Sequence, residues 1–201
     1  MKKHALIFGL IALMGISTLT SCEKEEEMTS VADMTIAEYA LSDDNFSILV
    51  QALTKADLVN VLNGEGNFTV FAPTNAAFNS LFTQLGVSGI SALSKEALTP
   101  ILLYHVLGTE KKAAMIETGY YNTLSPAQSN TMSLYINTSG GVKLNKSTSV
   151  TAADVDVKNG VIHVIDKVLL PPTVVDQALA NDSFSILVQA VVKAGLVETL
   201  S

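Results

Sequence analysis

Residues 159–170 read NGVIHVIDKVLL, and this stretch decides the fold. Asn-Gly accepts the positive φ that a type I′ turn needs, so this pair is predicted to join two strands, at 150–157 and 161–170. The second strand is apolar on both faces, apart from His163 and two charged residues near its end. We therefore expect both of its faces to be covered, as for a strand inside a domain.

Working outward from this hairpin, helical spacing dominates the first half of the domain and strand-like alternation the second. Apolar residues recur at i, i+3, i+4 and i+7 in three segments, which are predicted to be helices around 46–53, 74–85 and 94–106. Further strands are expected at 68–71, 131–136 and 142–146. Helices grouped early and strands grouped late predict an α+β fold with a mostly antiparallel sheet. Residues 107–130 are expected to be binding loops without a chemical signature.

A repeat sets the domain boundary. Residues 35–62 and 173–200 align without gaps at an offset of 138, with 16 identities in 28 positions. An offset of this size is a whole domain. We therefore expect one complete domain at 33–171, and the N-terminal fragment of a second copy at 172–201. The apolar helical face of the second copy has no partner of its own, so the chain is expected to be a piece of a longer tandem protein.

The N-terminus has the pattern of a signal for export. A basic start precedes a short apolar segment, and the segment 19–22, Leu-Thr-Ser-Cys, resembles the bacterial lipobox, in which the cysteine receives lipid. Cys22 is the single cysteine of the chain. The prediction is a lipoprotein signal peptide at 1–21, with membrane lipid as a partner through acylated Cys22. The alternative is a plain secretory signal with an incidental cysteine.

Residues 22–32 are predicted to form an acidic tether, because the charge run after Cys22 stays solvated. Cys-x-Lys followed by acidic residues also resembles the export signal that sends some Gram-negative lipoproteins to the outer face of the cell. The predicted location is the cell envelope, lipid-anchored in the outer membrane; surface display and a periplasmic position both stay open.

Composition excludes several classes of function. All 12 cationic residues are lysine, and the formal net charge is -7, so the chain offers no arginine fork and no basic surface for nucleic acid. One cysteine cannot make a Cys-based zinc site, and three scattered histidines leave little for a metalloenzyme. We expect no cofactor, no metal and no catalytic residues.

Three segments together resemble the fasciclin (FAS1) domain family. They are Thr-Val-Phe-Ala-Pro-Thr-Asn-Ala-Ala-Phe at 69–78, Leu-Tyr-His-Val at 103–106, and NGVIHVID at 159–166 with the following Leu-Leu-Pro. The resemblance spans 33–171. It implies a wedge-shaped β-sandwich flanked by α-helices, displayed outside the cytoplasm. It also implies a role in adhesion or matrix contact, without a common catalytic activity.

The first signature has a structural interpretation. Thr74 is predicted to cap a helix after a strand, and Asn75 belongs to the same joint. His105 shares an apolar helical face, so it is expected to be a buried residue whose nitrogens link its helix to Thr74 or Asn75.

Tyr104 and His105 are also candidate partner-binding residues, because the resemblance associates this neighbourhood with receptor contact in some animal members. The alternative for Tyr104 is packing against Pro100 and Ile101. His163 is predicted to be a core residue of its strand. Asp166, on the opposite face, needs either a donor or a solvated strand end.

These observations predict a cell-envelope lipoprotein whose FAS1 module binds a surface or matrix protein or glycan without catalysis. Two alternatives remain open. One is an envelope hydrolase acting on polysaccharide or ester bonds, which would need carboxylates or a Ser-His pair in one cleft. The other is a structural subunit of an envelope complex.

Overall fold

The computed structural model describes residues 30–126, 131–172 and 185–195. The predicted signal peptide, the lipidation site Cys22 and most of the acidic tether lie outside these residues. Among the described residues, no helix is both long enough and apolar enough to span a bilayer.

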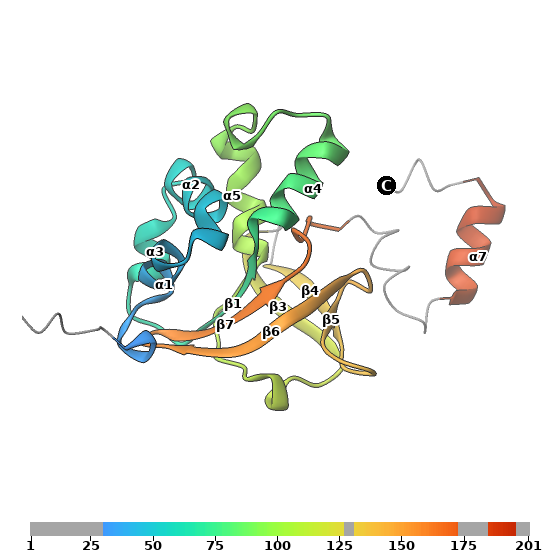
Figure 1. The fold of residues 1–201 in the computed structure, drawn as a ribbon. Coiled ribbons are helices and arrows are strands. Elements are labelled where there is room, and N and C mark those ends of the chain that lie inside the picture. The colour runs from blue at the N-terminus through green and yellow to red at the C-terminus, as the bar shows by residue number, and fades with distance from the viewer. Residues whose placement is uncertain (1–29, 127–130, 173–184, 196–201) are drawn as a thin grey trace, which may run out of the picture.

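Helices precede most of the strands, as predicted (Figure 1). The α-helices of the domain are α1 (Ile36–Ser42), α2 (Ser47–Lys55), α3 (Val59–Asn63), α4 (Asn75–Leu85) and α5 (Lys95–Tyr104). Short 3-10 turns lie at Val31–Asp33, Asp44–Phe46, Ile90–Ala92 and Ala113–Met115. The three predicted helical segments correspond to α2, α4 and α5, so the periodicity of apolar residues located them correctly.

Within the described residues, seven strands form one continuous ring of pairings. They are β1 (Phe68–Pro73), β2 (Val106–Leu107), β3 (Gly119–Pro126), β4 (Thr131–Asn137), β5 (Lys143–Leu144), β6 (Thr148–Val157) and β7 (Gly160–Ile165). Each strand pairs antiparallel with the next along the chain, and a parallel pairing of β1 with β7 closes the ring. The prediction of an α+β fold with a mostly antiparallel sheet is therefore confirmed.

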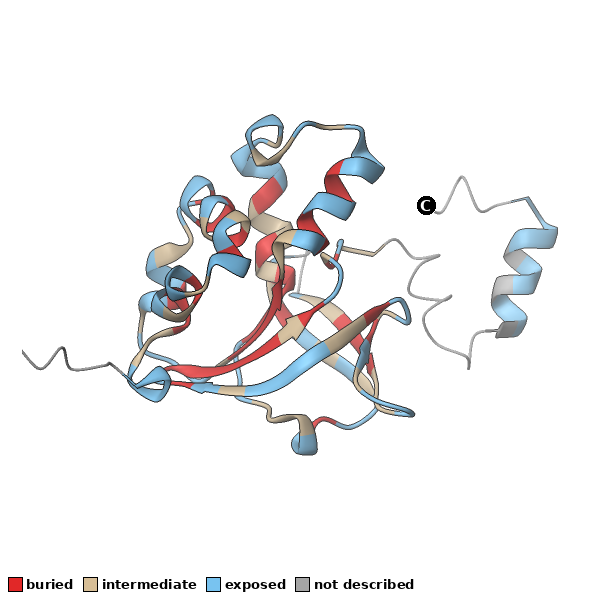
Figure 2. Ribbon diagram, in the orientation of Figure 1, coloured by how far each residue is buried: buried red, intermediate tan, exposed pale blue. Residues whose placement is uncertain are grey.

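The interior has two parts, which β1 and β7 separate (Figure 2). On one side, Val70, Ala72 and Ile162 pack beneath the helices with Leu49, Leu53 and Leu102. On the other, Phe71 and Ile165 point into the ring of strands with Tyr104. Successive side chains of a strand alternate between faces, so both faces of these two strands are covered, as the apolar sequence of β7 predicted.

Two expectations about strands were wrong. Residues 107–130 are not simply binding loops, because they contain the end of β2 and all of β3. The polar alternation of β3, with Thr123 and Ser125 buried, hides the usual apolar signature of a strand. In addition, β7 ends at Ile165 rather than continuing to residue 170.

The hairpin between β6 and β7 exists, but its turn is not type I′. A type I′ turn needs positive φ at both central residues, and Asn159 is not among the residues with positive φ. Gly160, which pairs with Val157 as the first residue of β7, has φ 150°, and a Cβ there would lie 2.0 Å from the Phe68 carbonyl oxygen. The glycine is required by this close approach of two backbones.

Asn159 serves the fold through its side chain. Its Oδ1 accepts a hydrogen bond from the Ile36 backbone N–H (2.9 Å). Its Nδ2 donates to the carbonyl oxygens of Leu62 and Gly64, at 2.8 Å each. The hairpin is thereby joined to the start of α1 and the end of α3, which fixes the helical layer against the sheet.

Part of the predicted second copy is described. Helix α7 (Ser185–Lys193) has the bounds of α2 shifted by 138 residues, and the two helices share 7 of 9 residues. The remainder of this copy lies outside the described residues. Ile186 and Leu187 of α7 are 81% and 51% exposed.

Candidate functional site

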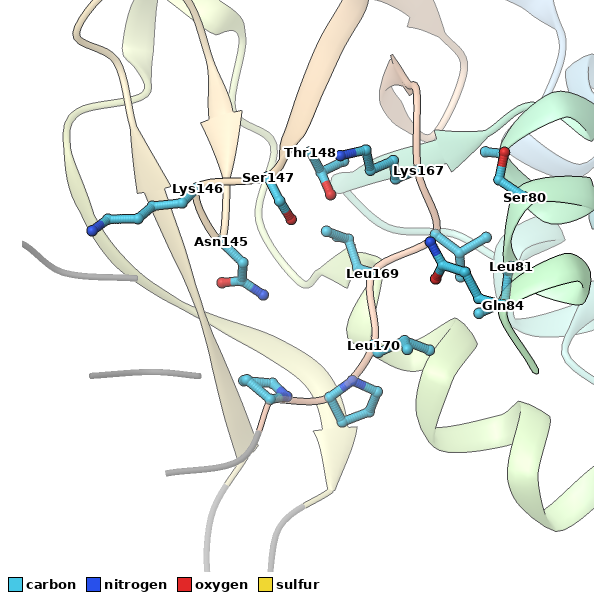
Figure 3. A pocket seen from close by; sticks show the side chains of 14 residues that line it. Ser80, Leu81, Gln84, Asn145, Lys146, Ser147, Thr148, Lys167, Leu169 and Leu170 are labelled. Atoms are coloured by element: carbon cyan, nitrogen blue, oxygen red, sulfur yellow. The ribbon is translucent and has the colours of Figure 1, made fainter. Parts of the chain in front are cut away.

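A cleft of about 500 Å³ opens between three parts of the domain: helix α4, the β5–β6 turn and the segment 167–172 after β7 (Figure 3). Its apolar lining is Ala77, Leu81, Val168, Leu169, Leu170, Pro171 and Pro172. Its polar lining is Ser80, Gln84, Asn145, Lys146, Ser147, Thr148 and Lys167. A volume of this order is typical of sites that hold a small molecule or a few residues of a peptide.

The first wall is α4, whose start is fixed by two signature residues. Thr74 caps the helix, as predicted: its Oγ1 accepts a hydrogen bond from the Ala77 N–H (3.4 Å). Asn75 Oδ1 accepts from the Ile48 N–H (2.9 Å), and its Nδ2 donates to the Asp44 carbonyl oxygen (2.8 Å). The N-terminus of α4 is therefore tied to the N-terminus of α2.

The second wall is the β5–β6 turn, which contains two consecutive residues with positive φ, Asn145 (45°) and Lys146 (64°). This conformation is costly for residues other than glycine and persists only where the surroundings hold it. Hydrogen bonds of the Asn145 side chain stabilise this conformation of the turn. Its Oδ1 accepts from the Tyr135 N–H (3.2 Å), and its Nδ2 donates to the Tyr104 hydroxyl (3.0 Å). The hydroxyl donates in turn to the Ser133 carbonyl oxygen (3.1 Å).

The third wall is the segment after β7, and His105 holds it. The Leu169 N–H donates to His105 Nε2 (2.9 Å), and His105 Nδ1 lies 2.8 Å from the Ile101 carbonyl oxygen. One ring nitrogen accepts and the other donates, which requires the neutral imidazole. Burial lowers the pKa of His105 to about 4, against an opposing effect of the bond to Ile101. The histidine is thus uncharged at neutral pH.

Asp166 joins the second wall to the third. Its Oδ1 accepts a hydrogen bond from the Ser149 N–H (2.8 Å), while its side chain stays exposed. Both predicted conditions, a donor and a solvated strand end, are met. The carboxylate therefore holds the start of β6 beside the end of β7.

The structure places Tyr104 and His105 in the interior, 0% and 3% exposed. A partner approaching the folded domain would meet exposed neighbours such as Lys146 and Leu170 rather than these side chains. The expectation that His105 links α5 to Thr74 or Asn75 was wrong: it links α5 to the segment after β7. The Tyr104 hydroxyl lies between β4 and the β5–β6 turn, where it donates to the Ser133 carbonyl oxygen and accepts from Asn145.

His163 does not belong to the cleft. It is 1% exposed, as predicted for a core residue, and its ring stacks on Phe71 with centroids 5.5 Å apart. Its Nε2 lies 2.9 Å from the Lys111 carbonyl oxygen, and its Nδ1 accepts from the Asp154 N–H (3.2 Å). It therefore fixes the loop after β2 against an irregular part of β6.

The chemistry of the cleft suits binding. Hydroxyl, amide and ammonium groups line it, whereas none of its described lining residues carries a carboxylate or an imidazole. A hydroxyl nucleophile needs an adjacent base to be activated. Across the described ranges, no group of three or more potential metal ligands gathers.

Sequence reasoning missed the polar residues that shape and line this cleft, among them Asn145, Thr148 and Lys167. One signal was available for Asn145, because asparagine is enriched several-fold at positive φ and stands in a short turn between two strands. No local signal marks Thr148 or Lys167, since their role depends on segments that come together only in the folded chain.

Comparison with known proteins identifies the family, because the fasciclin domain matches residues 44–171. The chain belongs to the fasciclin family. Its architecture also matches a solved FAS1 domain pair from the insect cell adhesion molecule fasciclin I, with a TM-score of 0.55 at 21% identity. That match covers 70% of this chain and 52% of the insect chain. The predicted FAS1 fold is thereby confirmed, with the ring of strands as its sheet component.

Relatives of this FAS1 protein come from bacteria and animals. Protein sll1483 of Synechocystis is 41% identical over 184 residues, covering 86% of this chain and 99% of the relative. The cell surface glycolipoprotein MPB83 of Mycobacterium bovis is 33% identical, covering 71% and 64%. Human periostin is 29% identical over 83% of this chain, which spans only 19% of periostin.

Proposed function

We propose that this protein is a cell-envelope lipoprotein whose FAS1 domain binds another surface or matrix component without catalysis. The observation that carries the proposal is the fasciclin match over 44–171 in a chain that carries a lipobox-like segment before it. The relative named a cell surface glycolipoprotein and the structural neighbour named a cell adhesion molecule support the same role.

In this proposal Cys22 carries the lipid and residues 22–32 space the domain from the membrane. Acyl chains hold a protein at a leaflet with about 0.8 kcal/mol per buried CH₂ group. Many anchored copies then act together, because tethering raises the effective concentration of weak contacts. The affinity of a single domain can accordingly be low.

The non-catalytic part of the proposal is supported by the cleft. Hydrolysis of a glycosidic bond uses two carboxyl groups about 5 to 10 Å apart, and ester hydrolysis needs a nucleophile with a base. The described lining of the cleft supplies neither arrangement. No observation favours the alternative of a structural subunit over a binding role.

We also propose that α7 is the counterpart of α2 in a second FAS1 copy, on the strength of the repeat. The proposal is checked by hydrogen exchange on the complete gene product. Amides of α7 should be protected as strongly as those of α2 if a second domain packs around α7. Exchange of α7 at the rate of an isolated helix would contradict it.

The main experiment compares cells that carry the native protein, no protein, or the variant Cys22→Ala. Metabolic labelling with a fatty acid should mark the native chain and leave the variant unlabelled. Adhesion to matrix proteins, glycans and neighbouring cells should fall in both altered strains. Unchanged adhesion in both would overturn the binding role, and equal labelling of the variant would overturn lipidation at Cys22.

A further inference from the structure

The cleft contains a buried hydroxyl without a partner. Thr148 is 3% exposed and lines the cleft, and no hydrogen bond joins its hydroxyl to any residue that the structure describes. Figure 3 shows this side chain extending toward the space beside Leu169. Buried polar groups in native proteins almost always have a partner, so an unpaired one that faces a cleft points to a ligand that supplies an acceptor.

The charged side chains in the described lining of this cleft are both lysines, in a protein that is acidic as a whole. Lys146 and Lys167 both line it, whereas the chain as a whole has a formal net charge of -7. Lys167 is exposed and forms no ion pair or hydrogen bond within the described part of the chain. An ammonium group and a hydroxyl donor at one site favour an anionic acceptor such as a carboxylate.

An aliphatic strip completes the cleft. Leu81 and Leu169 are buried in its walls, and Leu170 is 43% exposed at its edge. This surface fits an aliphatic side chain better than a sugar, because each sugar hydroxyl buried against leucine would lose its hydrogen bonds to water. The described lining has no carboxylate that would repel an anion.

We propose that this cleft binds an acidic peptide segment, with a carboxylate at Lys167 and Thr148 and an adjacent aliphatic side chain against Leu170. The inference rests on the proposed binding function and names the class of partner. The partner is then a surface or matrix protein that presents an exposed segment rich in acidic and aliphatic residues.

The walls of the cleft are prepared for such a ligand. Tyr104 fixes the turn that leads into Thr148, and His105 fixes the segment that carries Lys167 and Leu170. Asp166 joins these two walls. Groups that are already held in place lose little conformational entropy on binding, which favours a measurable affinity for a short segment.

The test uses the full chain and a fluorescent, end-blocked peptide of alternating glutamate and leucine, with fluorescence anisotropy as the readout. A matched peptide with glutamine in place of glutamate is the neutral control. The glutamate peptide should bind about fivefold more tightly, which is the upper value for one solvated ion pair, and the difference should shrink at high salt.

Three variants locate the site. Lys167→Ala and Thr148→Val should each weaken binding about threefold to tenfold, because each removes one polar contact with the carboxylate. Lys158→Ala is the matched control, since it removes the same charge from an exposed position in the β6–β7 turn, outside the cleft. Its affinity should equal that of the native chain, and all three should retain the native far-ultraviolet circular dichroism.

Several results would overturn the inference. They are equal binding of the two peptides, equal losses for Lys158→Ala and Lys167→Ala, and no peptide binding at millimolar concentration. Binding of a uronate oligosaccharide in place of the peptide would also reject it, because the partner would then be a glycan. Normal adhesion of cells that carry Lys167→Ala would overturn the proposed role of the cleft but leave the proposed adhesion role intact. Failure of the cleft proposal is therefore distinguishable from failure of the adhesion proposal.

Discussion

Helices α2 and α7 have nearly the same sequence and different surroundings. The segment Ser-Ile-Leu-Val-Gln-Ala occurs in both. Leu49 of α2 is 6% exposed, whereas the equivalent Leu187 of α7 is 51% exposed. Periodicity alone predicts a helix in both places, and the structure has one in both. What differs is the burial, which depends on the elements around each helix.

Helix α2 is held in the domain by contacts with particular neighbouring elements. It contacts α1, α4 and α5, and Asn75 binds its first turn through the Ile48 N–H. A helix of nine residues is marginal by itself in water, so most of the stability of α2 comes from these contacts. The contrast with α7 yields four predictions, in order of decreasing effect on the free energy of unfolding of the domain.

The largest effect on the free energy of unfolding is expected for Gly160→Ala. The control is Gly195→Ala, at the glycine that follows α7. A Cβ at Gly160 would lie 2.0 Å from the Phe68 carbonyl oxygen, whereas a Cβ at Gly195 would meet no atom within 4 Å. Urea denaturation followed by circular dichroism should show a loss of at least about 4 kcal/mol for Gly160→Ala. Gly195→Ala should leave the main transition unchanged, and equal effects would contradict the structure of the β1–β7 junction.

The second test truncates equivalent leucines. Leu49→Ala should lower the free energy of unfolding by about 3 kcal/mol, because it removes a buried side chain and leaves a cavity. Leu187→Ala should change it by less than about 0.5 kcal/mol. A loss for Leu187→Ala that approaches the loss for Leu49→Ala would show that α7 is packed against the same domain.

The third test measures how the free energy of unfolding of the domain that contains α2 depends on pH, through the titration of His105. Burial lowers the pKa of His105 to about 4, below the unfolded value of 6.5. The unfolded chain therefore binds the proton more readily, and the stability contributed by neutral His105 is present above pH 6.5 and is lost as pH falls toward 4. Between pH 7.5 and 5 the free energy of unfolding should fall by about 2 kcal/mol.

The control for this pH dependence is His105→Ala. This variant should lack the His105 contribution to the slope and be less stable at pH 7.5, because the Leu169 N–H loses its acceptor. A variant that melts like the native chain but no longer binds a partner would contradict the structural assignment of His105. A native chain with the same slope as the variant would contradict the lowered pKa.

The smallest of the four effects is expected for Asn75→Ala. The substitution removes the acceptor for the partly buried Ile48 N–H and the donor to the Asp44 carbonyl oxygen. Stability should fall by about 1 kcal/mol. Hydrogen exchange should become faster at the start of α2 and stay unchanged in α7, and unchanged exchange at Ile48 would contradict the role of Asn75.

The parts of the fold that sequence predicted are those controlled by neighbours along the chain. The cap by Thr74, the helices α2, α4 and α5 and the burial of His163 all follow from local patterns. The turn at residues 158–160 was placed correctly but given the wrong conformation. The side chain of Asn159 bonds to three distant backbone groups, and that contribution outweighs the local preference of Asn-Gly.

The cleft could not be predicted, although the residues around it were noticed. Tyr104, His105 and Asp166 were singled out from motifs, but their partners Asn145, Leu169 and Ser149 are 17 to 64 residues away. The family resemblance made Tyr104 and His105 candidate partner-binding residues. The structure places both side chains in the interior, where they hold two walls of the cleft in position.

Sequence by itself determined the fold class, the family resemblance and the helices, because these depend on the spacing of apolar residues and on short motifs within one segment. Tertiary structure decided how α2 is buried, why residue 160 must be glycine and where a cleft forms. Each of these depends on the approach of segments far apart in the chain, such as β1 and β7, whose parallel pairing closes the sheet.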